Sequence, residues 1–247
     1  MDLYLAGQNG RQMGRMDHII ENQPNVAILE SFFYADEWIE KWASKLSKFL
    51  LDSGAFTFFT SGQKIDWYDY IDRYCDFINR HDVKLFFELD IDKLVGYEKV
   101  KEFRKQIEQK TGKQCIPVWH KSRGKDEFIK MCDEYPYVSI GGIVSGEIKR
   151  DEYKFFPWFI REAHKRGAKI HGLGFTNLEG LTKYLFDSVD STAWTTGNRF
   201  GAIYKFNGKT MIKYSKKPGQ KLADSKQAAI NNFNEWVKFQ QYAVEHL

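Results

Sequence analysis

Short apolar runs rich in β-branched and aromatic residues alternate along the chain with segments of helical period. This alternation is typical of parallel βα units rather than of a sandwich, in which strands follow one another directly. Eight runs are expected as strands, at residues 3–6, 26–30, 49–52, 84–90, 115–120, 137–142, 169–172 and 188–193. Eight such units predict an α/β fold, a single (β/α)8 TIM barrel.

The segments between the runs carry the signals of helix starts and ends. After Asp66, a suitable N-cap, apolar side chains recur at the spacing of one helical face, at Trp67, Tyr70, Ile71, Tyr74 and Ile78. A later face is formed by Val100, Phe103 and Ile107, in a helix that is expected to stop near Gly112, since glycine favours the left-handed C-cap. Asn177 is expected to cap a short helix.

The pattern changes after the last βα unit. Residues 202–206 and 209–214 read as two strands joined by Asn207-Gly208, the preferred type I′ hairpin turn. A final helix is expected from about Asp224, with Ile230, Phe233 and Val237 on its buried side. No linker or internal repeat interrupts the chain, so residues 1–247 are expected to form one domain, with the core motifs in 48–201 and the hairpin and terminal helix in 202–247.

Length and composition agree with a single barrel. The 247 residues match the roughly 250 that this fold typically needs, and 43% hydrophobic residues supply a core. No apolar run reaches the 18 residues of a spanning helix, and the first residues lack the basic region of a signal peptide. Cys75, Cys115 and Cys132 are odd in number and far apart, which indicates neither a disulfide framework nor a cysteine zinc site and fits a cytoplasmic protein.

The net charge of +4 is only mildly basic, but its distribution is uneven. One stretch near the C-terminus holds a single acid, Asp224, among the cations Lys205, Lys209, Lys213, Lys216, Lys217, Lys221 and Lys226. Such a local excess either neutralises phosphates of a nucleic acid or is a solvated, lysine-rich hairpin.

Five of the apolar runs end in polar or glycine residues. The endings are Asp52-Ser53-Gly54, Glu88-Leu89-Asp90, Trp119-His120, Gly141-Gly142 and Val189-Asp190. In a parallel barrel the carboxyl ends of all strands meet at one mouth, where such enzymes place their catalytic groups. The series therefore indicates an enzyme.

Asp52 and Asp190 are far apart in sequence, yet strand ends place them at the same mouth. Two carboxylates are the equipment for glycosyl transfer, in which one attacks an anomeric carbon and another group moves protons on the leaving group. Each aspartate taken alone is equally well explained as a helix N-cap or a satisfied loop carboxylate.

The other strand ends offer groups for a planar ligand. Asp90 and Asp92 lie on one side of an extended segment and suit the N–H groups of a guanine edge, or, without a clear third ligand, a weak magnesium site. His120 is either a structural histidine or a base or ligand. Residues 141–147 contain three glycines, which allow a close backbone approach to a ligand or a tight turn.

At this point the motifs resemble a family, the tRNA-guanine transglycosylases. Asp52-Ser53-Gly54-Ala55-Phe56 is similar to the family's Asp-Ser-Gly-Gly-Phe, and Gly141-Gly142-Ile143-Val144-Ser145-Gly146-Glu147 to its Gly-Gly-Leu-Ala-Val-Gly-Glu. His171-Gly172-Leu173-Gly174, followed by Asp190, resembles its Met-Gly-Val-Gly and downstream nucleophile. The order and spacing hold over roughly residues 48–201.

The resemblance implies a role for each matching residue. Asp190 would be the nucleophile that forms a covalent sugar–enzyme intermediate, and Asp52 the general acid/base. The base-binding residues would be Ser53, Asp90, Asp92, His120, Gly141, Gly142, Ile143, His171 and Gly172. Nucleic-acid contacts are expected from Arg199, Lys205, Lys209, Lys213, Lys216 and Lys217, and Trp119 and Phe56 are candidates for stacking on a flipped base.

The chain also departs from the family pattern. No cysteine follows Cys132, so the family's zinc subdomain is absent, Thr196 replaces an arginine, and Ser191 replaces a cysteine after the nucleophile. The short, zinc-free pattern with Pro117-Val118-Trp119-His120 is more similar to the DpdA-type relatives of phages and bacteria. The resemblance therefore implies exchange of guanine in DNA for a 7-deazaguanine such as preQ0, with no metal or cofactor and with homodimer formation left open.

Three alternatives remain at this stage. The same chemistry on tRNA or another RNA changes only the polymer. A barrel that binds nucleic acid or a base without catalysis would not need both Asp52 and Asp190. A glycoside hydrolase barrel would use the same carboxylates on a sugar glycoside.

Overall fold

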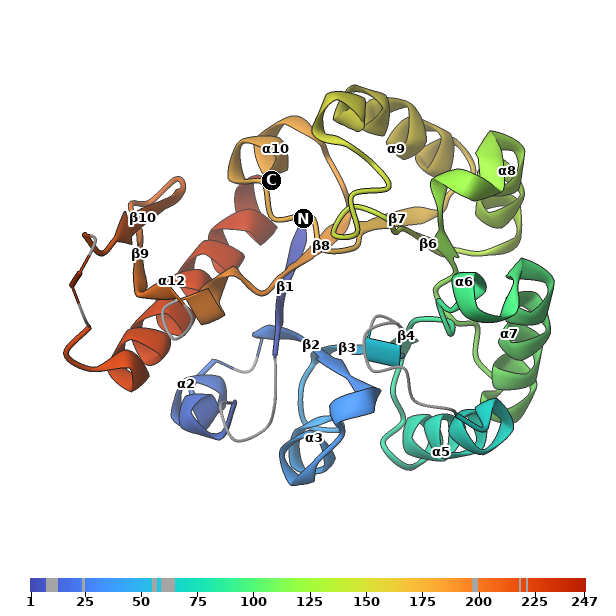
Figure 1. Cartoon of the computed structure of the whole chain (residues 1–247), viewed down its shortest axis with the longest axis horizontal. Helices are drawn as coiled ribbons and strands as arrows, with labels where there is room; N and C mark the ends of the chain where they lie inside the picture. Colours follow the sequence, from blue (N-terminus) through green and yellow to red (C-terminus); the bar gives the residue numbers. More distant parts are fainter. Residues whose placement is uncertain are drawn as a thin grey trace.

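A computed structural model of the chain describes residues 1–7, 13–23, 25–54, 57–58, 65–196, 200–217, 219–220 and 222–247. Eight parallel strands alternate with helices, and the α/β TIM-barrel prediction is confirmed (Figure 1). The strands are β1 Asp2–Ala6, β2 Ala27–Ser31, β3 Lys48–Asp52, β4 Leu85–Phe86, β5 Val118–Trp119, β6 Tyr137–Ile140, β7 Lys169–Gly172 and β8 Ser188–Ser191. An antiparallel hairpin, β9 Ala202–Phe206 and β10 Met211–Ser215, follows.

The helices lie outside the strands (Figure 1). The α-helices are α2 Asp17–Glu21, α3 Glu37–Trp42, α5 Trp67–Arg80, α6 Asp92–Val95, α7 Tyr97–Thr111, α8 Gly124–Glu134, α9 Phe156–Lys165, α10 Leu178–Lys183 and α12 Ser225–His246. Short 3-10 helices are η1 Gly14–Met16, η2 Phe32–Tyr34, η3 Lys121–Arg123, η4 Arg150–Phe155 and η5 Ala193–Thr195. Among the described helices, none is long and apolar enough to cross a membrane.

The sheet runs in the order β4-β3-β2-β1-β8-β7-β6-β5. A bridge between Phe87 and Ile116 joins its two ends, where Ile116 N–H donates to the Phe86 carbonyl at 2.8 Å and Glu88 N–H to the Ile116 carbonyl at 3.1 Å. The ring of backbone hydrogen bonds is thus closed. The strand ends that the sequence placed at one mouth do share one end of this ring.

Two strands are shorter than predicted. The expected strands at 84–90 and 115–120 are reduced to β4 and β5, two residues each. The cause is the buried side chain of Glu88, whose Oε1 accepts the Val118 N–H at 2.8 Å in place of a backbone carbonyl. A carboxylate thereby interrupts the ladder at this position.

The predicted helix caps are confirmed. Asp66 Oδ1 accepts from the backbone N–H of Tyr68 and Asp69 at 3.0 and 3.2 Å. Gly112 has the left-handed conformation, with φ of 67°, and Asn177 accepts from Gly180 N–H at 3.1 Å. The side chains of Asp66 and Asn177 satisfy N–H groups that have no partner within the first turn of a helix.

The predicted hairpin forms, but its turn is different. Phe206 pairs with Met211, which leaves a four-residue loop, and Asn207 Oδ1 accepts from Lys209 N–H at 3.0 Å and Thr210 N–H at 2.9 Å. Only Gly208 of the Asn207-Gly208 pair has positive φ, at 92°, so the type I′ prediction is wrong. The turn is closed by the asparagine side chain together with one backbone hydrogen bond, from the Asn207 N–H to the Thr210 carbonyl at 3.1 Å.

Helix α12 completes the outer ring beside β1. Gln240 fixes it there, since its amide donates to the carbonyls of Leu3 and Ala27 at 2.5 and 2.8 Å and accepts from Ala27 N–H at 3.0 Å. Asn232 on the same helix accepts Tyr204 N–H from β9 at 2.7 Å. The helix thereby holds both the first strands of the barrel and the hairpin. The helix begins where it was expected, with Asp224 as its N-cap.

The core has two parts. Tyr4, Leu29, Leu50, Phe87 and Val118 belong to the cluster that fills the interior of the ring, and a larger cluster lies between the strands and the helices. The three cysteines are buried and free, in agreement with the expectation of no disulfide framework.

Candidate active site

The carboxyl ends of the strands surround a cavity of about 1770 Å³. Of the residues predicted to form the site, Asp52, Asp90, Asp92, His120, Gly142, Ile143 and Asp190 line it. Typical small-molecule pockets have roughly 300–1,000 Å³. The mouth is therefore large enough for a nucleotide together with part of an attached strand.

Asp190, at the end of β8, is held through one of its carboxylate oxygens. Oδ1 accepts the Gly174 N–H at 2.5 Å and lies 3.2 Å from Nε2 of His171. The side chain of Asp190 is nearly buried but reaches the cavity wall. A carboxylate in this position is oriented by its partners and offers its other oxygen, Oδ2, to a ligand.

His171 lies behind Asp190 rather than in the cavity. It is fully buried, and its ring centroid is 5.3 Å from that of Phe87 and 6.2 Å from that of Tyr4. The expectation that His171 contacts a base is therefore wrong. Its side chain belongs to the interior layer of the ring, one level below the mouth.

Asp52, at the end of β3, carries a perturbed carboxyl group. Burial raises its pKa to about 6; the Gly54 N–H, which donates to Oδ2 at 3.0 Å, opposes the rise, and the charge of Asp190 adds to it. Gly54 has φ of 81°, and a Cβ there would lie 2.5 Å from Cβ of Phe33. The glycine after Ser53 is thus required for the turn that aims its N–H at Asp52.

Ser53 does not reach the cavity, which corrects its assignment as a base-binding residue. It is buried, its carbonyl accepts the Tyr70 hydroxyl at 2.6 Å, and its Oγ lacks a hydrogen-bond partner. Gly172 is also packed away from the mouth, where a Cβ would meet Phe175 Cβ at 3.1 Å. Both residues shape the strand ends.

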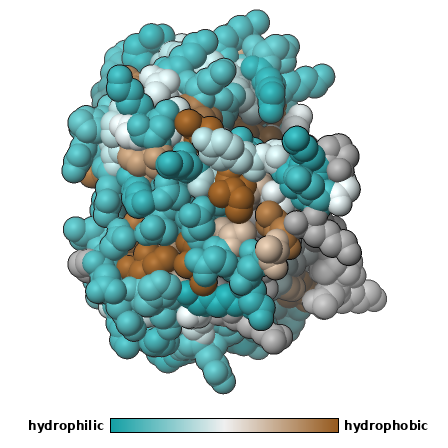
Figure 2. Space-filling view, turned by 90° about the vertical axis from the view of Figure 1, so that its left-hand side faces the viewer, coloured by the Kyte–Doolittle hydropathy of each residue, from teal (hydrophilic) through white to brown (hydrophobic). Residues whose placement is uncertain are grey.

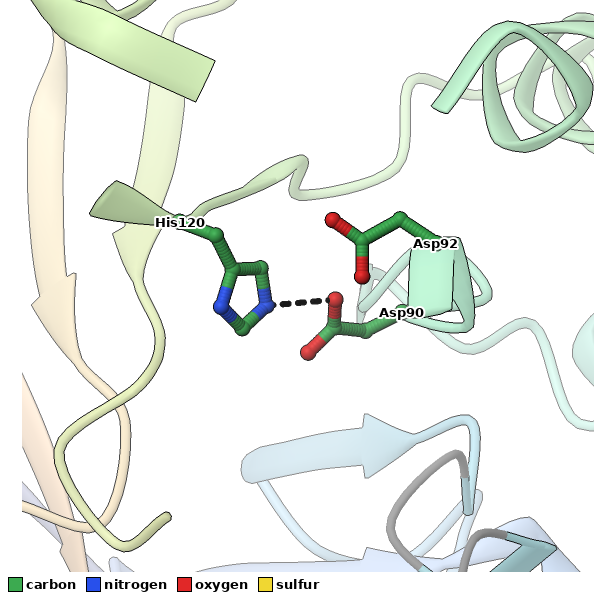
Figure 3. A group of neighbouring side chains, drawn as sticks. All are labelled: Asp90, Asp92 and His120. Atoms are coloured by element: carbon green, nitrogen blue, oxygen red, sulfur yellow. Dashed lines mark hydrogen bonds and ion pairs between the residues drawn. The ribbon is translucent and has the colours of Figure 1, made fainter. Parts of the chain in front are cut away.

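His120, at the end of β5, lies between two carboxylates. Its Nε2 is 2.7 Å from Oδ1 of Asp90, which points toward it from the end of β4 (Figure 3). Its Nδ1 is 3.1 Å from Oε2 of Glu147. Burial alone would lower the pKa of His120, but the hydrogen bond and the charge of Asp90 outweigh it and raise the pKa to about 8.

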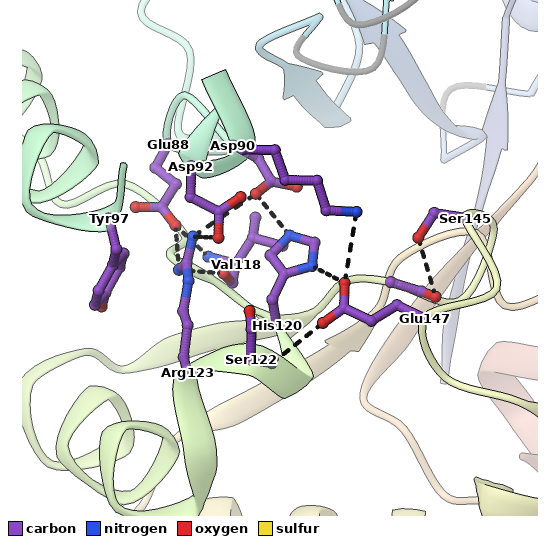
Figure 4. Close-up of polar contacts among 12 residues, drawn as sticks. Glu88, Asp90, Asp92, Tyr97, Val118, His120, Ser122, Arg123, Ser145 and Glu147 are labelled. Carbon is purple, nitrogen blue, oxygen red and sulfur yellow. Dashed lines mark hydrogen bonds and ion pairs between the residues drawn. The ribbon is translucent and has the colours of Figure 1, made fainter. Parts of the chain in front are cut away.

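A buried ion network supports this part of the wall (Figure 4). The guanidinium of Arg123 lies 3.2 Å from Oε1 of Glu88 and 3.4 Å from Oδ2 of Asp92, and it stacks 4.1 Å from the Tyr97 ring centroid. Glu88 also binds Arg104 at 2.7 Å. All three charged groups of the Glu88 cluster are almost completely buried, so each depends on its partners.

Asp90, Asp92 and His120 also have the side-chain types that bind metal ions. Ligand atoms of Asp90, Asp92 and His120 lie within 4.8 Å of one another. However, Arg123 already brings positive charge to both carboxylates, and His120 uses Nε2 toward Asp90. The contacts are those of an ion-pair network that presents carboxylates to the cavity.

Gly141 and Gly142, which follow β6, are required to be glycine for two different structural reasons. A Cβ at Gly141 would lie 2.7 Å from Val118 Cγ1 and 2.9 Å from His120 Cε1, so this glycine makes room for the histidine. It does not line the cavity, which corrects its assignment to base binding. Gly142 has φ of 80° and begins the turn that, together with Ile143, does line it. Close backbone approach to a ligand is therefore available at Gly142.

The predicted nucleic-acid contacts are mostly away from the mouth. Lys205, Lys209, Lys213, Lys216 and Lys217 are exposed on or after the hairpin, and none of them lines the cavity. Figure 2 shows the side of the molecule that carries the hairpin; it is mainly hydrophilic, with hydrophobic side chains in separate patches. Arg199 and Phe56 lie outside the described residues, as does Lys221.

Cations that do line the cavity are Lys93, Lys149 and Arg150, from the segments after β4 and β6. The sequence analysis did not single them out for binding. Trp119, in contrast, is buried against Phe159, with ring centroids 4.6 Å apart, so its assignment as a stacking platform at the mouth is wrong.

Other site residues were also missed. Glu147 ends the glycine motif and Arg123 follows His120 by three residues, one turn along η3. The three-residue spacing between His120 and Arg123 was the available signal, because one helical turn returns a side chain to the same face.

Comparisons with known proteins bear on the fold alone. No family model matches the chain, and no curated protein matches it. Among solved structures, it is similar to a crystal structure described as a fructose-1,6-biphosphate aldolase from Coccidioides immitis. The TM-score is 0.60 at 11% identity, over 99% of this chain and 89% of the other. The likeness agrees with the barrel.

Proposed function

We propose that this chain is a pentosyltransferase that exchanges guanine in DNA for a 7-deazaguanine such as preQ0. The observation that carries the proposal is the pair of carboxyl groups in one cavity, Asp190 at β8 and Asp52 at β3. Burial raises the pKa of Asp52 to about 6, whereas Asp190 is held through Oδ1 by the Gly174 N–H and by His171. A carboxyl with a raised pKa suits an acid/base, and an oriented carboxylate suits a nucleophile.

The reaction takes two displacements. Asp190 Oδ2 attacks C1′ of the flipped nucleotide, the bond from C1′ to the guanine nitrogen breaks, and the departing base receives the proton of Asp52. A 7-deazaguanine then enters, its N9–H proton passes to the Asp52 carboxylate, and N9 attacks C1′ to release Asp190. Each step leaves charge and protons balanced, and the configuration at C1′ is retained after two inversions.

The part of the cavity wall that follows β4, β5 and β6 supports recognition of a purine. Asp90, Asp92, His120 and the backbone at Gly142 line the same cavity as the two aspartates. Carboxylate oxygens accept the N1–H and exocyclic N–H groups of guanine, while backbone groups meet the other edge. Because guanine and 7-deazaguanine share these groups, one pocket serves both bases.

The cavity rim supports a polymer substrate. Lys149 and Arg150 are exposed, and they line the mouth together with Lys93. Cations on the cavity wall suit the phosphates that flank a flipped nucleotide. The hairpin lysines that the structure describes do not line the cavity, so they suit a non-specific contact elsewhere on the polymer.

The test is incorporation of radiolabelled preQ0 into polymer by the purified full chain. Duplex DNA, single-stranded DNA and tRNA are offered separately, with Asp190→Asn and Asp52→Asn beside the wild type. Asp126→Asn is the matched control, because Asp126 is exposed on α8 and outside the cavity. We expect label in DNA, none with Asp190→Asn, and unchanged incorporation with Asp126→Asn.

Each other result decides against part of the proposal. Full activity of Asp190→Asn would remove the nucleophile assignment. Label in tRNA alone would replace DNA as the polymer. Binding of DNA with no incorporation of any deazaguanine would indicate a non-catalytic barrel, and turnover of a simple glycoside would indicate a hydrolase.

A further inference from the structure

A chain of side-chain hydrogen bonds runs from Asp190 into the interior of the barrel. Nε2 of His171 is 3.2 Å from Asp190 Oδ1, and Nδ1 of the same ring is 2.5 Å from Ser188 Oγ. Ser188 Oγ in turn forms a hydrogen bond with the hydroxyl of Tyr137. The four residues come from three adjacent strands, β6, β7 and β8.

The register of the sheet makes this chain possible. His171 is directly opposite Ser188 in the β7–β8 ladder, and Asp190 is two residues further along β8, on the same face. Side chains alternate with a period of two, so Ser188 and Asp190 both point into the ring. The ring of His171 bridges the gap between them.

Chemistry sets the direction of every donor in this chain. An ionised Asp190 only accepts, so the hydrogen of His171 belongs on Nε2. A neutral ring then has a lone pair on Nδ1, which accepts from the Ser188 hydroxyl. The Ser188 oxygen accepts from Tyr137, and because burial raises the pKa of that phenol, Tyr137 keeps its hydrogen to donate.

We propose that Tyr137, Ser188 and His171 act as a positioning relay, which fixes His171 as its neutral Nε2–H tautomer and thereby holds the Asp190 carboxylate in one orientation. This inference rests on the proposed function for the role of Asp190 as nucleophile. The relay itself touches no substrate. Donors that all point toward one carboxylate polarise one another and strengthen the last bond.

The surroundings leave the ring little freedom. His171 is fully buried between the rings of Tyr4 and Phe87. The charged or titratable groups that share the cavity with Asp190 include the carboxyls of Asp52, Asp90, Asp92 and Glu179, the imidazole of His120, and the cations Lys93, Lys149 and Arg150. The charges of Asp52 and Asp190 interact unfavourably, and the N–H groups of His171 and Gly174 offset the negative charge at Asp190.

The first measurement is the tautomer of His171, by NMR of the full chain labelled with 15N-histidine. The signals of the six histidines are sorted by the one that disappears in His171→Gln. We expect a hydrogen on Nε2 and none on Nδ1 at neutral pH. In Ser188→Ala, Nδ1 loses its donor, and the Nδ1–H tautomer becomes populated.

The second measurement is the rate of covalent adduct formation between the protein and DNA in a single turnover. In Ser188→Ala, we expect this rate to fall, because the Nδ1–H tautomer of His171 turns a lone pair instead of a donor toward Asp190 Oδ1 for part of the time. In His171→Leu the rate should fall roughly tenfold to hundredfold, and His171→Gln, whose amide N–H can reach Oδ1, should restore most of it.

The matched control is Ser139→Ala. Ser139 is equally buried in the ring and donates to the backbone carbonyl of His171 at 3.3 Å, not to its imidazole. We expect this variant to change neither the tautomer nor the rate of adduct formation. Equal changes in Ser139→Ala and Ser188→Ala would show general loosening of the barrel and overturn the relay.

The outcomes separate the two proposals. A doubly protonated or Nδ1–H ring in the wild type overturns the relay whatever the reaction is, and so does an unchanged Nε2–H tautomer in Ser188→Ala. The predicted tautomers in a protein that never forms an adduct would support the relay while rejecting base exchange, because the NMR measurement needs no turnover.

Discussion

Nε2 of His120 lies 2.7 Å from Oδ1 of Asp90, while Nδ1 of the same ring lies 3.1 Å from Oε2 of Glu147. Both ring nitrogens are therefore engaged with carboxylates before any ligand arrives. Under the proposed function, an entering base would meet Asp90 with Oδ1 already in contact with His120, which leaves Oδ2 to accept from the base. The imidazole sets which carboxylate oxygen is offered.

The raised pKa of His120 predicts pH-dependent stability. With a folded-state pKa of about 8 against an unfolded value near 6.5, the favourable contribution is complete below about pH 6.5 and is lost as the pH rises through 8. We expect the stability advantage of the wild type over His120→Gln to shrink by up to ~2 kcal/mol between about pH 6 and about pH 9. Urea unfolding at both values measures it. His18→Gln, at an exposed position on α2, is the control, and a pH-independent difference for His120→Gln would contradict the ion pair.

Asp52 predicts the pH dependence of base release. As the proposed acid it must be protonated, so the rate of guanine release in a single turnover should fall as the pH rises through about 6. Asp52→Asn should lower that rate by roughly 10² to 10⁴ and remove this limb of the profile. Rapid-quench measurement of free guanine over a pH series tests both. An unchanged limb in Asp52→Asn would assign the titration to another group.

Removal of Arg123 should be costly to stability. The substitution Arg123→Met leaves buried Glu88 and Asp92 without a cation they contact, and we expect the free energy of unfolding to fall by about 3–5 kcal/mol. Arg73→Met is the control, since its pair with Asp69 is exposed and should contribute only about 0–1 kcal/mol. Denaturant unfolding measures both variants. Similar losses in the two would mean that the Glu88 network does not support the fold.

The rim and the hairpin should differ in DNA binding. In an Asp190→Asn background, which prevents turnover, we expect the double substitution Lys149→Gln and Arg150→Gln to weaken binding and to reduce the salt slope by about 1.8, or 0.9 for each phosphate contact. Lys213→Gln with Lys216→Gln removes the same charge from the hairpin and should leave the slope nearly unchanged. Fluorescence anisotropy at several salt concentrations tests this. A larger effect of the Lys213→Gln and Lys216→Gln variant would place the main DNA contact on the hairpin instead of the cavity rim.

The barrel could be predicted from the sequence because the signals for its strands and helices lie within short stretches of the chain. Runs such as residues 49–52 end in polar residues, and in a parallel sheet all such ends meet, so Asp52 and Asp190 were placed at one mouth correctly. How deep a side chain lies in the ring is set by the register between strands, which neighbouring residues in the sequence do not reveal. His171 and Gly172 follow one another in a strand, yet the first is an interior residue below Asp190 and neither reaches the cavity, because the register against β8 decides it.

The cations of the cavity wall were overlooked for a related reason. The hairpin lysines form the most evident cluster in the sequence, whereas Lys149 and Arg150 are a single pair followed by two acidic residues. Only the position of the segment after β6 at the mouth makes them neighbours of the reaction centre. Arg123 likewise gained its meaning from Glu88, 35 positions away in the chain.

The seam between β4 and β5 has a consequence for motion. Elsewhere each ladder of the ring contains two to five residue pairs, but here one bridge, Phe87 to Ile116, and the buried carboxylate of Glu88 join two-residue strands. Local opening follows the fewest cooperative contacts, so backbone amides at this seam should exchange with solvent before those of β1 or β8. Asp90 and His120 stand at its end. The half of the mouth that we propose to bind the base is thus the half expected to open locally, while the half that carries Asp190 is held by the four-pair ladder between β1 and β8.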